Sequence, residues 1–204
     1  MDEESDAAVI AASRHEPGAF GAIFDRHATA LHRYVVRRIG PGEAEAVVGD
    51  VFRIAFEKRH GYDVTRPSAR PWLYGIATNL VAKHRRREAR RLHAMARLVA
   101  RQGPASDHVD QVSAAVDAAA AWQRVAGAVA ALPRPERDAL VLHVWEGLAY
   151  DEVAVALAIP VGTVRSRLHR ARGRLRALGS PGGEQQGEST DQGTGSPAPG
   201  RIGS

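Results

Sequence analysis

The sequence of 204 residues contains no cysteine, which excludes disulfide bonds, thiolate zinc sites and cysteine nucleophiles. A chain without disulfides is compatible with a reducing compartment. Aromatic residues are also scarce, at 5% of the sequence, although the hydrophobic fraction is an ordinary 44%. Ala, Val and Leu dominate that fraction, and this composition favours small helical bundles over one large mixed core.

Long hydrophobic runs are absent as well. No apolar stretch is long enough to span a bilayer. The amino terminus has no basic start followed by an apolar stretch, so no signal peptide is evident. These absences predict a soluble, cytoplasmic protein without membrane insertion.

The sequence has an excess of positive charge. The formal net charge is +5 and the isoelectric point is about 10.2, which suits a polyanionic partner. The charge is unevenly distributed, because the arginines gather in two blocks while the amino end is acidic, with Asp2, Glu3, Glu4 and Asp6.

The carboxy-terminal basic block lies in Leu148–Leu178, a segment whose pattern predicts a helix-turn-helix. Apolar residues recur at helical spacing on both sides of a break at Ile159–Gly162. Pro160 suits the start of a new helix, because the N–H donor that it lacks would be unpaired there. Beyond the break, residues that step by three and four form one apolar seam: Val164, Leu168, Ala171, Leu175 and Leu178.

The rest of this second helix is cationic. Six arginines lie between Arg165 and Arg176 without a carboxylate, whereas an ordinary solvated helix mixes both signs of charge. Arg167 and Arg174 flank the seam. The side away from the seam carries Arg165, Ser166, His169, Arg170 and Arg176. We therefore interpret it as a recognition helix for the DNA major groove rather than as a solvated basic face.

The first half of the chain also reads as helical, because nothing in it alternates with a period of two for long. A short helix at Asp6–Ser13 is followed by a longer one at Phe20–Ile39, which Gly40-Pro41-Gly42 must end. The next helix, from about Glu43 to Lys58, carries three charged residues together on its polar side: Asp50, Arg53 and Glu57.

A third helix begins near Pro71, after a loop at His60–Arg70. Its buried side is predicted to hold Leu73, Ile76, Ala77, Leu80 and His84. Its opposite side is predicted to hold Thr78, Asn79, Ala82, Arg85 and Arg86. The helix runs into the second basic block, Lys83–Arg91, whose cations suit phosphate neutralisation. Trp72 and Tyr74 precede this block. Aromatic faces accept unstacked bases, but each ring taken alone is more typical of the core of a small bundle.

These patterns predict an all-α protein of two small helical bundles joined by a flexible linker. The predicted parts are an acidic amino-terminal segment (1–13), a first domain (14–92), a linker (93–117), a second domain of about four helices (118–178) and a tail (179–204). The tail is rich in Gly, Ser and Pro and is expected to be disordered. The core of the second domain is predicted to contain Val129, Leu140, Val144, Val153, Leu157, Val164 and Leu168.

From roughly Phe20 to Leu178, the chain resembles the extracytoplasmic-function (ECF) group of the sigma-70 family of bacterial sigma factors. The strongest part of the resemblance is Leu132–Leu178, and its most specific run is Pro160–Leu168. In the first domain, Asp50-Val51-Phe52 with Ala55-Phe56 resembles the polymerase-binding helix. Pro71–Leu80 followed by Arg85-Arg86 resembles the promoter-melting helix.

The resemblance implies an initiation factor that binds core RNA polymerase and promoter DNA and catalyses nothing, without metal or cofactor. The first domain would contact the clamp helices of the largest subunit, and the second the flap of the second-largest. The implied polymerase contacts are Asp50, Arg53, Phe56 and Glu57. The implied −35 contacts are Thr163, Arg165, Ser166, Arg167, His169 and Arg170. The implied −10 contacts, which would capture unstacked bases, are Tyr62, Trp72, Tyr74, Thr78, Asn79, Lys83, Arg85 and Arg86. An anti-sigma protein is a further partner that the resemblance suggests.

The chain departs from the family pattern at four positions. Ala46 replaces a usual acid and Gly49 a usual glutamine on the polymerase-binding helix, and Gly49 costs that helix roughly 1 kcal/mol relative to alanine. Lys83 stands where an acid is common in the melting helix. Ala149 replaces the usual Ser or Thr N-cap, so only Glu152 of a capping box remains.

Three other functions compete with this interpretation. A stand-alone regulator could carry the same helix-turn-helix, but it would need a ligand pocket or phosphoacceptor site, and the first domain offers neither pattern. An enzyme acting on nucleic acid finds little support, because the histidines form no HExxH motif and His27 and His32 are poorly spaced for one helical face. An inactive sigma-like protein that sequesters a partner stays open because of Ala46, Gly49 and Lys83.

Overall fold

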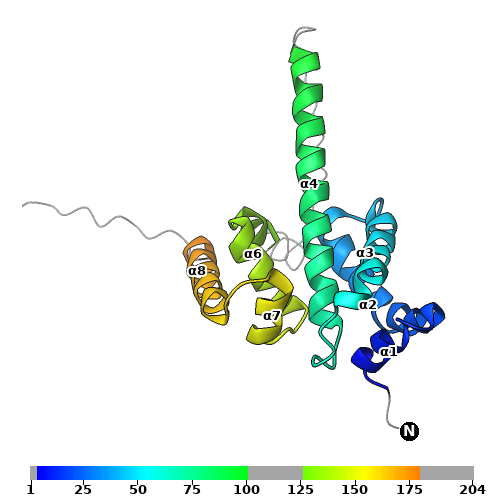
Figure 1. Cartoon of the computed structure of the whole chain (residues 1–204). Helices are drawn as coiled ribbons and strands as arrows, with labels where there is room; N and C mark the ends of the chain where they lie inside the picture. Colours follow the sequence, from blue (N-terminus) through cyan, green and yellow to red (C-terminus); the bar gives the residue numbers. More distant parts are fainter. Residues whose placement is uncertain (1–3, 101–125, 180–204) are drawn as a thin grey trace, which may run out of the picture.

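The fold was analysed in a computed structural model that describes residues 4–100 and 126–179 (Figure 1). All regular structure in these two ranges is helical, which confirms the all-α class for this part of the chain. The segment 101–125, with most of the predicted linker, and the predicted tail from residue 180 lie outside the described residues.

The first unit contains α1 (Asp6–Ala12), η1 (Pro17–Phe20), α2 (Gly21–Ile39), α3 (Ala44–Lys58), η2 (Arg59–Gly61) and α4 (Arg70–Ala100). The predicted break after Ile39 is confirmed, because Gly40 ends α2 with a φ of 83°, a conformation that favours glycine. Helices α2, α3 and α4 pack around one core whose largest buried side chains include Ile23, Leu31, Tyr34, Val35, Val51, Leu73 and Val81. Helix α4 continues to Ala100, beyond the predicted end of the first domain at residue 92.

The second unit contains a described helical stretch at residues 126–131, then α6 (Arg134–Leu140), η3 (Val141–Trp145), α7 (Tyr150–Leu157) and α8 (Val161–Gly179). The prediction that Val144 belongs to the core is wrong, since its side chain is 55% exposed. The reason is that η3 is a π-helical turn, in which the N–H of Glu146 bonds the carbonyl of Val141. This wider turn rotates Val144 outward and leaves Leu142 and Leu148 buried instead.

Most of the other predicted core positions of this unit are confirmed. Val129, Leu140, Val153, Val164 and Leu168 are buried, and Leu157 is half-buried.

Helix α4 lies between the rest of the first unit and the second unit, so that it is covered on two sides (Figure 1). Helices α2 and α3 pack on one side of it and α7 on another. The prediction that Thr78 and Ala82 face away from the buried side is therefore wrong, because both are buried. Of the predicted buried side, Leu73 and Ala77 are buried, whereas Ile76, Leu80 and His84 are only half-buried. Thr78 instead bonds Tyr34 of α2, a contact that helical periodicity did not predict.

The amino-terminal helix is held in place by one carboxylate. The side chain of Asp6 accepts hydrogen bonds from His27 (2.7 Å), Arg26 (3.1 Å) and the backbone N–H of Ala69 (2.9 Å), and thereby links α1 to α2 and to the start of α4. Burial of Asp6 acts to raise its pKa, but these hydrogen bonds and the charge of His27 outweigh burial and lower the pKa from 3.8 to about 2.

We predict that Asp6→Asn lowers the free energy of unfolding by about 2 kcal/mol at pH 7. Because the pKa of Asp6 is lower in the folded chain than in the unfolded chain, its contribution is complete above about pH 4 and is lost as the pH falls toward 2. Urea unfolding followed by circular dichroism across this range measures the difference between variant and parent. Asp25→Asn, at an exposed acid on α2, is the control. Equal stability of the Asp6 variant and the parent at pH 7 would contradict the assignment.

The N-cap of α7 is Ala149, whose backbone is extended (φ −65°, ψ 164°). One half of a capping box is formed, because the Glu152 carboxylate accepts a hydrogen bond from the Ala149 N–H (2.8 Å). The other half is missing, because the alanine side chain has no atom that could accept a hydrogen bond from an N–H of the first turn. We predict that Ala149→Ser stabilises the chain by about 1 kcal/mol, because the new hydroxyl accepts from an unpaired N–H of the first turn. Thermal unfolding measures this gain. An unchanged or lower melting temperature would show that the missing acceptor does not limit the helix.

Candidate functional site

Helix α8 presents two contrasting faces. Val164, Leu168 and Ala171 are buried and Leu175 is half-buried, which confirms the predicted seam over the described side chains. The opposite face is exposed and carries Arg165, Ser166, His169 and Arg170. The turn before α8 is tight, because Ala158 ends α7 in the left-handed region (φ 51°) and Pro160 precedes the first helical residue of α8. The seam thus fixes the orientation of α8, and its cationic face is turned to solvent.

An acid on α6 holds two arginines of α8. The buried carboxylate of Glu136 lies 3.2 Å from Arg170 Nε and 3.0 Å from Arg174 Nε. Arg170 is therefore already paired in the free protein. Among the residues that the structure describes, no hydrogen bond or ion pair is found for Arg165 or His169. Glu136 is not among the site residues predicted from the sequence, because no spacing pattern links it to the arginines of α8.

The two remaining predicted −35 residues are less exposed. Thr163 is half-buried, and its carbonyl accepts from the Ser166 hydroxyl (3.0 Å). Arg167 is half-buried and lines a hollow between α8, α7, α6 and α4 that also includes Thr78 and Asn79. The structure therefore offers Arg165, Ser166 and His169 most directly to a ligand.

Helix α3 carries an exposed ionic cluster. Arg53 donates to Asp50 (3.1 and 3.2 Å) and to Glu57 (2.8 Å), and these hydrogen bonds, with Asp50 the larger contributor, raise the pKa of Arg53. All three side chains are exposed, so the predicted grouping on one polar face is confirmed. Ala46 and Gly49 are exposed on the same helix.

Phe56 does not belong to this ionic cluster. It is half-buried, its ring meets Phe20 edge-on with centroids 5.5 Å apart, and the guanidinium of Arg59 lies 3.9 Å from its centroid. A partner could contact only the part of the Phe56 ring that this packing leaves exposed.

The aromatic residues predicted for the −10 element are largely enclosed. Tyr62 is buried, donates to the carbonyl of Arg66 (2.7 Å) and packs its ring 5.0 Å from that of the half-buried Trp72. Burial and the nearby charge of Asp6 raise the pKa of Tyr62 to about 12. Tyr74 is 1% exposed and donates to Glu146 of the second unit (2.7 Å). The alternative interpretation of Tyr74 as a core residue is thus confirmed for the free chain.

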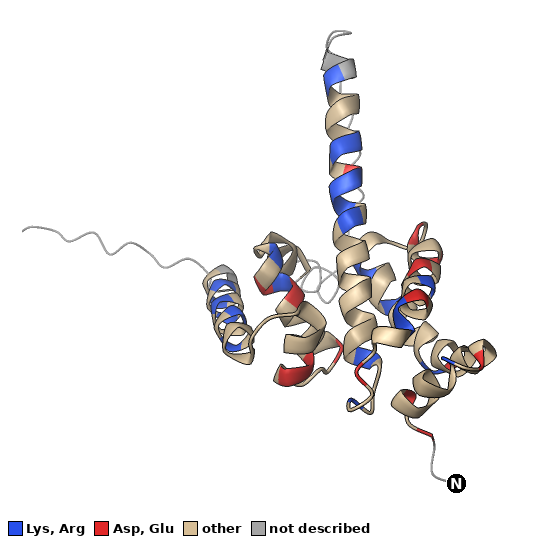
Figure 2. Ribbon diagram, in the orientation of Figure 1, with Lys and Arg blue, Asp and Glu red and all other residues tan. Residues whose placement is uncertain are grey.

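Some polar residues of α4 form hydrogen bonds within the protein, and others are exposed. Thr78 bonds the Tyr34 hydroxyl and the carbonyl of Tyr74 (both 2.7 Å), and Arg85 donates to the carbonyl of Arg38 (3.0 Å). Asn79, Lys83 and Arg86 are exposed. Figure 2 shows that Lys and Arg line the projecting half of α4 and α8, the two helices that the sequence assigns to nucleic acid.

Within residues 4–100 and 126–179, no cluster of three or more His, Asp or Glu could hold a metal ion. No helix in these ranges is long and apolar enough to cross a membrane.

Comparisons with known proteins agree with this geometry. Family models described as "Sigma-70 region 2" and "Sigma-70, region 4" match residues 23–91 and 122–175. The chain is 32% identical over 171 residues to the ECF RNA polymerase sigma factor SigL of Mycobacterium tuberculosis, a match covering 83% of this chain and 94% of SigL. It is 30% identical over 181 residues to the ECF RNA polymerase sigma factor SigK of Mycolicibacterium vanbaalenii, covering 86% and 87%.

Solved structures also match. CnrH, in complex with the cytosolic domain of CnrY, has a TM-score of 0.59 at 28% identity, and the match covers 85% of this chain and 96% of CnrH. The sigma factor RpoE of Bartonella quintana, in complex with the anti-sigma factor NepR, has a TM-score of 0.56 at 23% identity, covering 79% and 96%, and so shares the fold. From the matched regions and the identity to SigL, the chain belongs to the ECF group of the sigma-70 family of RNA polymerase sigma factors.

Proposed function

We propose that this protein binds core RNA polymerase and directs it to promoters by recognising the −35 and −10 elements. The observation that carries the proposal is the pairing, in one chain, of a sigma-70 region 2 with a region 4 whose α8 turns an exposed cationic face away from its buried seam. The protein acts by binding and catalyses no reaction of its own. Its place of action is the cytoplasm, with the polymerase, and an anti-sigma protein is a further proposed partner.

In this proposal α8 enters the major groove of the −35 element. Arg165, Ser166 and His169 face solvent next to one another and can reach base edges or phosphates. Arg170 is held by Glu136, so we assign it to the phosphate backbone, where a fixed cation positions the helix. Thr163 and Arg167 border this face, and the second unit would also contact the polymerase flap.

Polymerase binding is assigned to the exposed face of α3. Asp50 and Glu57 flank the guanidinium of Arg53, and Phe56 lies on the same helix. Exposed ion pairs of this kind contribute little to folding, so they are free to exchange partners with the clamp helices of the largest subunit. The exposed Asn79, Lys83 and Arg86 of α4, with Arg85, continue toward the −10 element. Tyr62, Trp72, Tyr74 and Thr78 complete the proposed set of −10 contacts.

We predict that Arg165→Ala reduces promoter-specific transcription by roughly 5- to 150-fold, the equivalent of about 1–3 kcal/mol for one bidentate base contact. The measurement is run-off transcription, with core polymerase, from a promoter selected in vitro out of randomised DNA. Arg33→Ala, at an exposed arginine on α2, is the matched control and should retain activity. Polymerase affinity should be equal in both variants. Full transcription by Arg165→Ala would exclude a base-reading role for this residue.

A separate prediction concerns the exposed face of α3 and its affinity for core polymerase. Asp50→Lys with Glu57→Lys should weaken the affinity for core polymerase at least tenfold, since like charges opposed across an interface cost several kcal/mol. Fluorescence anisotropy of the labelled chain titrated with core polymerase measures the affinity. Both positions are exposed, so circular dichroism should show an intact fold. Asp25→Lys, on the exposed surface of α2, controls for one such charge reversal outside the α3 face. Unchanged affinity of the double variant would place the polymerase contact elsewhere.

A further inference from the structure

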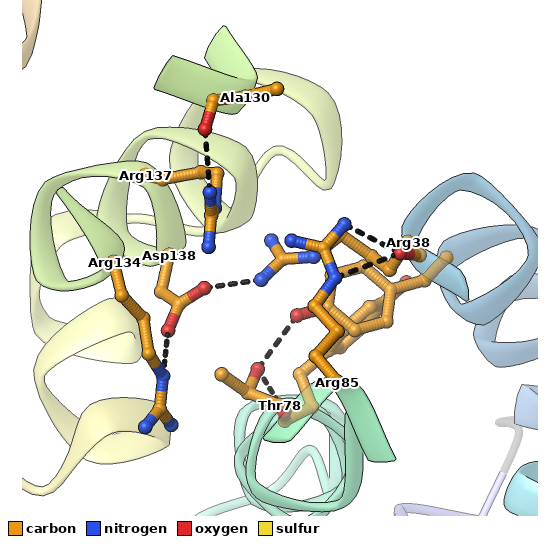
Figure 3. Close-up of polar contacts among 9 residues, drawn as sticks. Arg38, Thr78, Arg85, Ala130, Arg134, Arg137 and Asp138 are labelled. Atoms are coloured by element: carbon orange, nitrogen blue, oxygen red, sulfur yellow. Dashed lines mark hydrogen bonds and ion pairs between the residues drawn. The ribbon is translucent and has the colours of Figure 1, made fainter. Parts of the chain in front are cut away.

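Helix α6 carries two buried acids that face different partners. Asp138 pairs with Arg38 of α2 and with Arg134 on its own helix (Figure 3). Glu136, which stands two positions earlier, pairs instead with α8, the helix that packs against α6 in the second unit. The Glu136 side chain is 8% exposed. A carboxylate is thus buried directly beside the helix whose exposed face is cationic.

The two oxygens of Glu136 serve two different arginines. Oε1 accepts a hydrogen bond from Arg170 Nε (3.2 Å), and Oε2 forms an ion pair with Arg174 Nε (3.0 Å). Within the described part of the chain, Oε2 is buried and accepts no hydrogen bond, so Arg174 is the cation that offsets its charge. Arg170 and Arg174 are four residues apart and are therefore neighbours on one side of α8. One carboxylate holds two adjacent guanidinium groups.

Both contacts use the Nε edge of the guanidinium groups. Among the residues that the structure describes, no hydrogen bond or ion pair engages the Nη atoms of Arg170 or Arg174. The two side chains are 52% and 56% exposed. A guanidinium is a planar fork of several N–H donors, so its terminal Nη groups stay available after Nε has been used. Glu136 therefore fixes two forks whose free ends suit oxyanions such as phosphate.

Affinity for nucleic acid does not explain the presence of this acid, and neither does stability. A negative charge beside a cationic face repels phosphates and so weakens sequence-independent binding. A buried carboxylate also loses hydration, which offsets much of its attraction to a cation, and half-exposed partners contribute little. What the contact provides is orientation. An arginine side chain that is held before binding loses less conformational entropy when it binds.

The held pair lies next to the predicted base-reading residues. Arg165, Ser166 and His169 lie in the first half of α8, and Arg170 and Arg174 follow toward its carboxyl end. At about 100° per residue, the last two fall at one edge of the exposed face. In helix-turn-helix proteins the amino-terminal part of the second helix contacts base edges, whereas phosphate contacts fix its register. A rigid pair at the edge of the face is therefore placed to set that register.

We propose that Glu136 is a positioning residue for promoter recognition, which holds Arg170 and Arg174 as a clamp on the −35 phosphate backbone and so sets the register of α8 on the bases. The inference rests on the proposed role of α8 as the −35 helix. Glu136 lowers the affinity for any duplex and raises the discrimination between correct and incorrect −35 sequences. A mobile pair of arginines would bind phosphates in several registers, and the neighbouring side chains would then meet wrong base pairs.

Glu136→Gln tests this role. Glutamine keeps the shape of the side chain and one carbonyl oxygen, but its amide nitrogen donates and cannot accept from a second arginine. The matched control is Asp151→Asn, which also removes one negative charge from the second unit, at an exposed position of α7. Circular dichroism checks that both variants are folded.

A second variant leaves Glu136 in place. Arg170→Lys with Arg174→Lys, at two exposed positions, keeps both positive charges. An ammonium group is a point charge without the planar fork that binds Glu136 through one edge and phosphate through another. The double Lys variant should therefore lose discrimination as Glu136→Gln does, and unchanged discrimination in it would contradict the clamp.

Orientation is measured in the free full-length chain by NMR relaxation of the arginine Nε–H groups. The resonances of Arg170 and Arg174 are those that disappear in the single Lys variants. We expect restricted motion of both groups in the parent and in Asp151→Asn, and increased motion in Glu136→Gln. Mobile groups in the parent, or a Glu136 variant that matches the parent, would overturn the positioning role without any need for polymerase.

Discrimination is measured by run-off transcription with core polymerase, from a promoter selected in vitro out of randomised DNA and from copies with one −35 base pair changed. The change should lower transcription by the parent roughly 5- to 150-fold, as expected for one mismatched base pair. In Glu136→Gln this ratio should fall at least about twofold, the lower end of the coupling within one ion-pair network. Asp151→Asn should keep the ratio of the parent.

Two further measurements separate positioning from a purely structural effect. Glu136→Gln should bind a random-sequence fluorescent duplex at least as tightly as the parent, because a negative charge has been removed. Added to Arg170→Ala with Arg174→Ala, it should cause no further loss of discrimination, because the groups that it positions are gone. Weaker duplex binding, or a further loss, would overturn the inference.

Failure of this inference is distinct from failure of the proposed function. A parent chain without promoter-specific transcription would contradict the proposed function, and the clamp with it. Promoter-specific transcription with equal discrimination by the parent and by Glu136→Gln would overturn the clamp alone.

Discussion

The arrangement of this protein depends on the covering of α4 from two sides. One side packs on α2 and α3 through Leu73 and Val81, as helical periodicity requires. The other side accepts α7 only because Gly75 leaves room for the backbone at Ala156. Since helices pack without voids, this one missing Cβ decides whether the two units can form a continuous structure.

Charge determines how firmly that packing holds. Glu146 and Asp138 bring two buried carboxylates to a surface rich in arginine. Arg38, the partner of Asp138, is buried as well, whereas Arg37, the partner of Glu146, is 41% exposed. Buried ion pairs align surfaces more reliably than they stabilise them, because the desolvation of both charges offsets their attraction. The same arginines are the groups that a nucleic acid attracts. An interface of this composition therefore aligns the two units more than it stabilises their contact.

Much of the fold and part of the site were predictable because their causes are local. The seam of Val164 and Leu168, the break at Gly40 and the ionic face around Arg53 follow from spacing within one helix. What could not be predicted arises from distant contacts or rare geometry. The π turn exposes Val144, Thr78 is buried against Tyr34 of α2, and Glu136 pairs with Arg170. Arg38 and Asp138 are 100 positions apart, and no periodic pattern links them.

The proposed function requires two exposed faces in one chain, that of α3 for core RNA polymerase and that of α8 for promoter DNA. The most direct measurement is size-exclusion chromatography of the full-length chain with bacterial core RNA polymerase, without DNA. A stoichiometric complex is the predicted result. Separate elution of core polymerase and a folded, helical chain would contradict the proposal.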